Sequence, residues 1–224
     1  MGVVKHNING NDYLGVFATS TDKYALVWDG VSKRDRGTIA ENLKVKCIGV
    51  SIARSDLIGI FSRGNSNGLV LSNMAEDKEV EAIRKSGIDI KIGRLDSDLN
   101  TVGNNILAND KVAIVNPDYT RNEMNSIGEI LDVEVVGAEA GEFKTVGASN
   151  ILTNKGIVVN NRCTDAEADR IKEITGFDVV RTTANTGALS IGLSAIANSF
   201  GIIIGESTTG FEMARMLEAL DIDS

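Results

Sequence analysis

The sequence is poor in the residue types from which most catalytic and nucleic-acid-binding sites are built. Its 224 residues include one histidine, two cysteines and one proline, and only 4% are aromatic. Because His6 is the sole histidine, no second imidazole can share a metal ion, and we expect a solvated or hydrogen-bonded side chain rather than a catalytic base. So few aromatic rings also exclude a platform on which bases stack.

Cysteine spacing, charge and hydropathy exclude further classes. Cys47 and Cys163 form no CxxC pair, which is typical of reduced thiols in a cytoplasmic protein, and we expect them to be small buried thiols. The net charge of −8 and the absence of a basic run disfavour a clamp on nucleic acid. The most apolar segment, residues 190–205, is interrupted by Asn198 and Ser199, so no membrane span is predicted. With 42% hydrophobic residues, the chain can still bury a sizeable core.

One sixteen-residue segment recurs along the whole chain. It reads DYLGVFATSTDKYALV at residues 12–27 and DLIGIFSRGNSNGLVL at residues 56–71, and it returns at 100–115, 144–159 and 189–204. The copies align without a gap on Gly15, Gly59, Gly103, Gly147 and Gly192, at spacings of 44, 44, 44 and 45 residues. A fixed period of this length indicates a repeat architecture.

Each copy predicts a strand, a turn and a second strand. Turn-forming pairs occupy its middle, namely Thr21-Asp22, Asn65-Ser66, Asn109-Asp110, Thr153-Asn154 and Asn198-Ser199. An apolar run closes each copy, as in Leu69-Val70-Leu71, and predicts a strand buried on both faces. The glycine-rich stretch 64–68 is followed by this strand and not by Lys-Ser/Thr and a helix, so a hairpin turn is favoured over a phosphate loop.

A helix and a last strand complete each unit. Capping boxes predict helix starts at Thr120/Glu123, Thr164/Glu167 and Thr209/Glu212, and a similar box lies at Thr38/Glu41; unit two has no Thr there and leaves its helix start open. The last strands are predicted at Val45–Ile48, Ile88–Ile92, Val133–Val136 and Phe177–Val180. Unit five lacks its own, and we expect Val3-Val4 to complete it. The prediction is an α/β closed ring of five ββαβ units with five-fold pseudosymmetry, in a single domain spanning residues 1–224.

The repeated glycines and the asparagines of the turns admit two interpretations. Glycine permits close backbone approach, so five equivalent glycines near an axis indicate packing; the alternative is that they leave room for a ligand or partner. Asparagine suits turns for local reasons, yet pseudosymmetry would also gather these amides on one flat polar binding face. The asparagines concerned are Asn65, Asn67, Asn104, Asn105, Asn109, Asn150, Asn154, Asn185 and Asn198.

These segments resemble the translation initiation factor 6 family of archaea and eukaryotes along essentially the whole chain. The resemblance is carried by NGNDYLGVF at residues 9–17, Gly64-Asn65 before Gly68-Leu69, Gly103-Asn104 before Asn109-Asp110, Gly156-Ile157 and Asn185-Thr186-Gly187. It implies a pentein-type ring without catalytic activity or cofactor, and the length is similar to that of archaeal members. The sequence ends at Ser224, without the long tail of eukaryotic members, so regulation by phosphorylation of that tail is not expected.

The resemblance also implies partners. It suggests a monomer that binds the intersubunit face of the large ribosomal subunit, through a ribosomal protein close to the sarcin–ricin loop, and so keeps the small subunit away. It further implies a role in late large-subunit maturation, with release by a translocation-type GTPase and a maturation factor. The ring face near the repeated glycines is the expected contact surface, with Ile60, Asn104 and Leu193 as principal residues and Arg63, Asn65, Asn105 and Asn109 as neighbours.

An enzyme remains the alternative, because the pentein architecture is shared with guanidino-group hydrolases and transferases. Those enzymes resemble one another in using a nucleophilic Cys near the C-terminus with His and acidic residues around the axis. Here no cysteine follows Cys163 and the sole histidine is His6, so the required set is missing.

Overall fold

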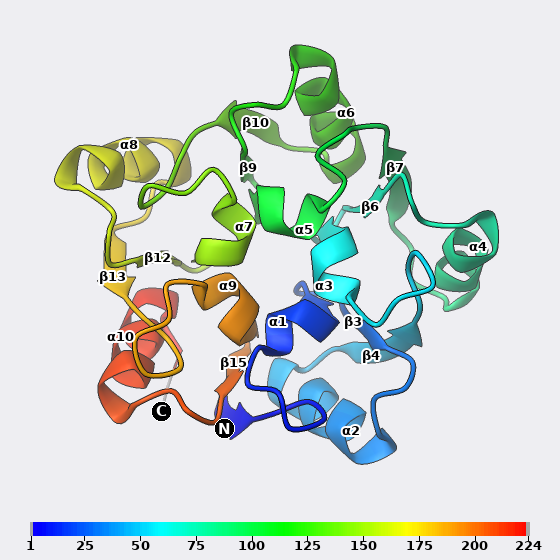
Figure 1. Ribbon diagram of the computed structural model, residues 1–224, viewed down its shortest axis with the longest axis horizontal. Helices are drawn as coiled ribbons and strands as arrows, with labels where there is room; N and C mark the ends of the chain where they lie inside the picture. Colours follow the sequence, from blue (N-terminus) through cyan, green and yellow to red (C-terminus); the bar gives the residue numbers. More distant parts are fainter. Residues whose placement is uncertain (1, 223–224) are drawn as a thin grey trace.

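The structure, a computed structural model that describes residues 2–222, is a ring of five units around one axis (Figure 1). Every unit has a one-turn helix, two strands, a long helix and a last strand, in that order. Unit one contains α1 (Leu14–Phe17), β2 (Ala18–Ser20), β3 (Tyr24–Trp28), α2 (Lys33–Leu43) and β4 (Lys46–Val50). Unit two contains α3 (Ile58–Phe61), β5 (Ser62–Gly64), β6 (Gly68–Ser72), α4 (Asp77–Lys85) and β7 (Lys91–Leu95).

The other three units repeat this order. Unit three contains α5 (Val102–Asn105), β8 (Ile106–Ala108), β9 (Val112–Val115), α6 (Arg121–Leu131) and β10 (Glu134–Gly137). Unit four contains α7 (Val146–Ser149), β11 (Ile151–Leu152), β12 (Ile157–Asn160), α8 (Asp165–Thr175) and β13 (Val179–Thr182). Unit five contains α9 (Ile191–Ser194), β14 (Ala195–Asn198), β15 (Gly201–Gly205), α10 (Gly210–Leu220) and, from the start of the chain, β1 (Val3–His6).

The N-terminal strand closes the ring as expected. β1 pairs parallel with β15, from Val3 opposite Ile202 to His6 opposite Gly205. In each of the five three-stranded sheets the first strand of the hairpin is antiparallel to the central strand, and the last strand is parallel to it. The parallel pair requires a crossover, which the long helix provides.

The central strands explain why their sequences are apolar without alternation. Successive side chains of a strand point to opposite faces, and here each face meets a different core. In β6, Leu69 and Leu71 pack in the core shared with unit one, whereas Val70 packs in the core shared with unit three. The last core joins Ile196 and Ile203 of unit five to unit one. Burial between neighbouring units therefore holds the ring together.

The capping boxes predicted for units three, four and five are confirmed. Thr120, Thr164 and Thr209 are N-caps, and the glutamate three residues later completes each box. The box predicted at Thr38 is wrong, because α2 begins five residues earlier with Ser32 as its N-cap, and Thr38 lies inside the helix. Unit two uses an acidic cap, in which Glu79 accepts a hydrogen bond from the Glu76 N–H at 2.9 Å.

Two strand predictions need correction. The segment with the repeated glycine is a helical turn rather than part of a strand, and the first strand of each hairpin begins after it. The last strand of unit two is β7 and not Ile88–Ile92, because Lys91 pairs with Gly68 at the start of β6. Ile88 and Ile90 instead pack against the core on the way from α4 to the sheet. Within residues 2–222, the structure contains no helix with the length and apolarity needed to cross a membrane.

Candidate binding face and axial cavity

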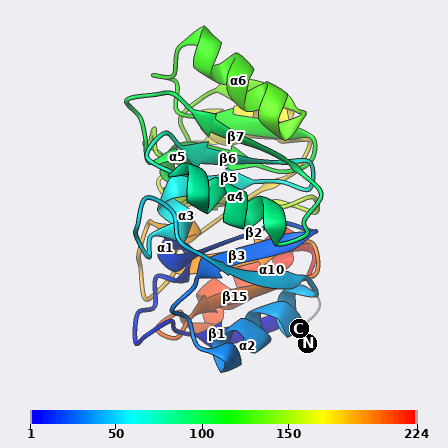
Figure 2. The same ribbon diagram turned by 90° about the vertical axis from the view of Figure 1, so that its right-hand side faces the viewer.

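The five one-turn helices form one end of the ring. α1, α3, α5, α7 and α9 surround the axis in Figure 1, and each contacts the next until α9 meets α1. Figure 2 shows α1, α3 and α5 gathered along one side of the molecule. We call this end, formed by the residues of the five one-turn helices, the helix face.

The repeated glycines are the contact points between these helices. A Cβ atom on Gly59 would overlap the carbonyl oxygen of Gly15, and one on Gly103 would overlap that of Gly59. The same relation joins Gly147 to Gly103, Gly192 to Gly147 and Gly15 to Gly192, so the glycines form a closed ring. These approaches agree with the packing interpretation of the glycines, since only a residue without Cβ allows them.

The residue after each glycine faces outward. In all five units the glycine and the apolar residue before it are buried, whereas the next residue is partly exposed. These five residues are Val16, Ile60, Asn104, Ala148 and Leu193. The three principal contact residues expected from the sequence, Ile60, Asn104 and Leu193, therefore share the helix face. The Asn104 Oδ1 atom is enclosed and accepts no hydrogen bond within the described residues.

The neighbouring asparagines have a structural role instead. Asn65, Asn105 and Asn109 are 2%, 3% and 4% exposed, too little for direct contact with a partner. The Asn65 Oδ1 atom accepts the N–H of Gly68 in its own turn, and its Nδ2 donates to the carbonyl oxygen of Asn109 at 3.0 Å. Asn109 in turn donates to the Thr153 carbonyl oxygen at 3.0 Å.

Asparagine is thus used twice at these turns. Its side-chain oxygen accepts an N–H of the same turn, as the sequence predicted, and its Nδ2 atom donates to a carbonyl oxygen of the neighbouring unit. The hydrogen bond to the neighbouring unit was not predicted, although Thr or Asn recurs at this position of the repeat in all five units. Asn105 is different, because its Nδ2 donates to the Thr101 carbonyl oxygen at 3.0 Å and its Oδ1 accepts from Asn116.

At the opposite end of the axis, hydrogen bonds link the turns of the five units in an open chain. The Asn154 Nδ2 atom donates to Asp22 at 2.8 Å and to Asp110 at 2.7 Å. Asp22 also accepts from the Ser199 N–H, and Asp110 from the Ser66 N–H. The two ends of the ring therefore differ, since the helix face has uncharged side chains, whereas the turn end carries the charges of Asp22, Asp110, Lys23, Lys111 and Lys155.

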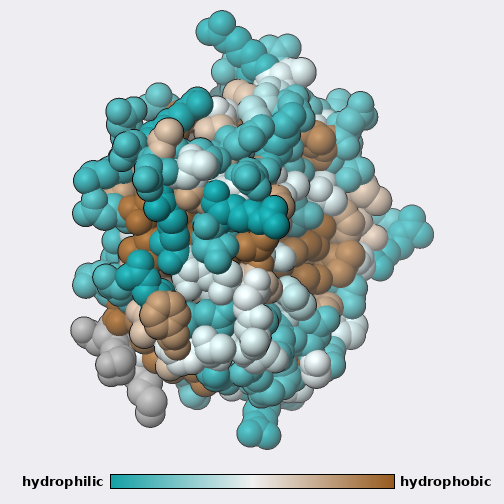
Figure 3. All heavy atoms as spheres, turned by 60° about the vertical axis from the view of Figure 1, so that its left-hand side comes forward, coloured by the Kyte–Doolittle hydropathy of each residue, from teal (hydrophilic) through white to brown (hydrophobic). Residues whose placement is uncertain are grey.

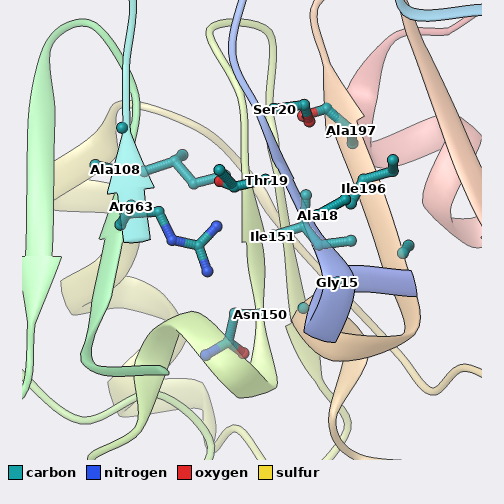
Figure 4. Close-up of a pocket in the computed structure, with 14 residues that line it drawn as sticks. Gly15, Ala18, Thr19, Ser20, Arg63, Ala108, Asn150, Ile151, Ile196 and Ala197 are labelled. Atoms are coloured by element: carbon teal, nitrogen blue, oxygen red, sulfur yellow. The ribbon is translucent and has the colours of Figure 1, made fainter. Parts of the chain in front are cut away.

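Arg63 does not lie on the helix face but inside the ring. Its Nη2 atom donates to the carbonyl oxygens of Gly103 at 2.7 Å and Gly147 at 3.2 Å. The guanidinium projects into a cavity of about 30 Å³, beside which Thr19 and Asn150 also lie (Figure 4). Burial lowers the pKa of Arg63 to about 10.

The groups needed for enzymatic chemistry are scattered. The His6 Nε2 atom lies 3.1 Å from Asp35 Oδ1, away from the residues that line the axial cavity. Burial raises the pKa of Cys47 to about 11 and also raises that of Cys163, so neither thiol is activated as a nucleophile. Cys47 and Cys163 belong to units one and four, and neither lines the axial cavity. Within residues 2–222, no group of three or more His, Cys, Asp or Glu side chains could hold a metal ion.

Fold and site together define a class: a five-unit α/β ring with one face formed by closely packed helical turns. The model of the eIF-6 family matches residues 3–219, and the chain belongs to that family. Translation initiation factor 6 from Thermococcus onnurineus is 36% identical, with 98% of this chain and 98% of that protein covered. The protein of the same name from Pyrococcus horikoshii is 37% identical, with 98% and 99% covered.

Solved structures show a weaker likeness. A crystal structure of a dimethylarginine dimethylaminohydrolase adduct with S-methyl-L-thiocitrulline overlaps with a TM-score of 0.47 at 13% identity, covering 76% of this chain and 68% of that one. DDAH from Pseudomonas aeruginosa complexed with citrulline gives a TM-score of 0.44 at 11% identity, with the same coverage. Overlaps this partial carry no information on activity.

Proposed function

We propose that the protein is a ribosome anti-association factor, which binds the intersubunit face of the large ribosomal subunit and keeps the small subunit from joining. Membership of the eIF-6 family and the name of its relatives support a role in translation. The helix face is the proposed contact surface, because Ile60, Asn104 and Leu193 are partly exposed there around the axis.

The helix face suits docking to a large and rigid partner. Its backbone is fixed by the glycine contacts, so little conformational entropy is lost on binding. The partly exposed apolar side chains of Ile60 and Leu193 supply contact area. Figure 3, which views the ring obliquely, shows brown hydrophobic atoms among the teal hydrophilic atoms that form most of the outline.

The proposed mechanism is exclusion rather than turnover. A protein bound on the intersubunit face occupies volume that the small subunit needs, so the rate of dissociation decides how long the subunit stays inactive. The partner is a ribosomal protein near the sarcin–ricin loop. Release by a translocation-type GTPase with a maturation factor, a role in late subunit maturation, action as a monomer and a cytoplasmic location belong to the same proposal.

The alternative function, modification of a guanidino group, has less support. It requires a reactive thiolate next to His and acidic groups on the axis. Cys163 is buried with a raised pKa, and His6 lies beside Asp35. A guanidino-substrate assay distinguishes the two functions, because a binding factor leaves such substrates unchanged.

Sucrose-gradient co-sedimentation with purified large and small subunits tests the proposal. The protein is expected to travel with the large subunit alone and to reduce formation of the joined ribosome. Migration at the top of the gradient at low salt would contradict it, and so would equal binding to both subunits.

A further inference from the structure

One position of the repeat carries a charge in a single unit. The residue four positions after the repeated glycine belongs to the first strand of each hairpin, and in the five units it is Thr19, Arg63, Leu107, Ile151 and Ile196. All of these except Leu107 line the axial cavity. Arg63 is therefore a lone cation in a wall of uncharged side chains.

The charge of Arg63 is incompletely satisfied. A guanidinium has five N–H donors, and here Nη2 reaches two carbonyl oxygens. The Nε atom is enclosed and has no hydrogen-bond partner among the described residues. No carboxylate of the described chain acts on Arg63, whose pKa is perturbed by burial alone. Arg63 is partly buried, and a charge withdrawn from water in this way is costly unless another group or ion compensates it.

A second unsatisfied donor lines the same cavity. Thr19 is 2% exposed, and its Oγ1 atom has no hydrogen-bond partner among residues 2–222. Figure 4 shows Thr19 and the Arg63 guanidinium beside the same central space. The cavity of about 30 Å³ has room for ordered water or for one small anion.

We infer that the axial cavity is a site for a single small monovalent anion, held by the Arg63 guanidinium beside Thr19. The ion compensates the partly buried guanidinium, whose Nη2 donates to the carbonyl oxygens of Gly103 and Gly147. Binding of the ion therefore stabilises, from the cavity side, the glycine contact between α5 and α7. The site is structural, and it stands whether or not the helix face binds a ribosome.

Bromide provides a direct test, because its anomalous scattering identifies the ion at a known position. Crystals of the full chain grown in sodium bromide are expected to show an anomalous peak in the axial cavity beside the Arg63 guanidinium. An ordered water without anomalous signal at that position would overturn the proposal. Arg63→Leu crystals, if the variant folds, are expected to lack the peak.

Solution measurements distinguish a specific site from a general salt effect. At fixed ionic strength, replacing gluconate by chloride is expected to give a saturable rise in Tm of about 2–4 °C in the parent protein. The rise is expected to vanish in Arg63→Leu and to shrink in Thr19→Val, which keeps the shape but removes the hydroxyl. Arg54→Leu is the matched control, because the Arg54 side chain is 78% exposed and its loss should leave the response intact. Equal chloride responses in all four proteins, or no response in the parent, would overturn the proposal.

Discussion

Replacing Gly103 by alanine tests the glycine ring quantitatively. The added Cβ would overlap the Gly59 carbonyl oxygen and lie 2.8 Å from the Ser62 carbonyl oxygen. Both obstacles are backbone atoms, so no side chain can rotate away, and the neighbouring helices must separate. Overpacking of this kind costs about 1–3 kcal/mol, and backbone obstacles place Gly103→Ala in the upper part of that range.

The expected result is a lower stability with an unchanged fold. A loss of about 2–3 kcal/mol corresponds to a Tm lower by about 4–12 °C for a chain of this size. Thermal unfolding followed by circular dichroism measures it, with Gly37→Ala as the control. Gly37 lies within α2 and its Cβ would meet nothing within 4 Å, so that variant gains about 0.5–1 kcal/mol of helix propensity. Equal Tm values for Gly103→Ala and the parent protein would refute the packing argument.

Three further experiments probe the helix caps, the Glu212 carboxylate and the Cys47 thiol. Thr164→Ala is expected to lower the free energy of unfolding by about 1 kcal/mol, because it removes an N-cap. Thr38→Ala, inside α2, should change this free energy little. Equal effects of the two variants in urea unfolding would contradict the observed helix starts. Glu212→Gln should cost about 1–3 kcal/mol at pH 7, because the carboxylate accepts hydrogen bonds from Thr183, Thr209 and Gly187. Burial opposes ionisation of Glu212, but these hydrogen bonds outweigh it and lower the pKa of Glu212 from 4.5 to about 2. The loss in free energy of unfolding of the variant should therefore be full above pH 4.5 and should disappear as the pH falls towards 2. A loss that is independent of pH would contradict this assignment. At pH 8, Cys47 should react with a thiol reagent on the order of a hundredfold more slowly than a free cysteine, because burial raises its pKa to about 11, and a rate similar to that of free cysteine would contradict its burial.

The repeat determined most of the fold in advance. The period gave the number of units, and the apolar stretch at Val3-Val4 predicted the strand that closes the ring. Three capping boxes located helix starts because Thr and Glu bond to each other's backbone, which is local chemistry. The same local pattern failed at Thr38, where Ser32 and Asp35 supply the cap and the helix simply continues through Thr38.

Features that depend on contacts between units were harder to predict. The one-turn helices have four residues and no side-chain cap, so the sequence contains no pattern there that predicts a helix. The amides of Asn65 and Asn109 reach carbonyls in the next unit, and composition alone made them resemble exposed turn residues. Arg63 was predicted on the outer face, yet its strand position directs it to the axis. Counting four residues from each glycine would have identified it as an inward position.

The helix face is the central claim, and an affinity measurement tests it most directly. The comparison is between Ile60→Glu on the helix face and Lys111→Glu at the exposed turn of the opposite end. Binding to purified large subunits is expected to weaken at least about tenfold for Ile60→Glu, or about 1.4 kcal/mol, and to change little for Lys111→Glu. Both variants should keep the circular dichroism spectrum of the parent protein. Unchanged affinity of a folded Ile60→Glu variant, or a larger loss for Lys111→Glu, would contradict the assignment of the helix face.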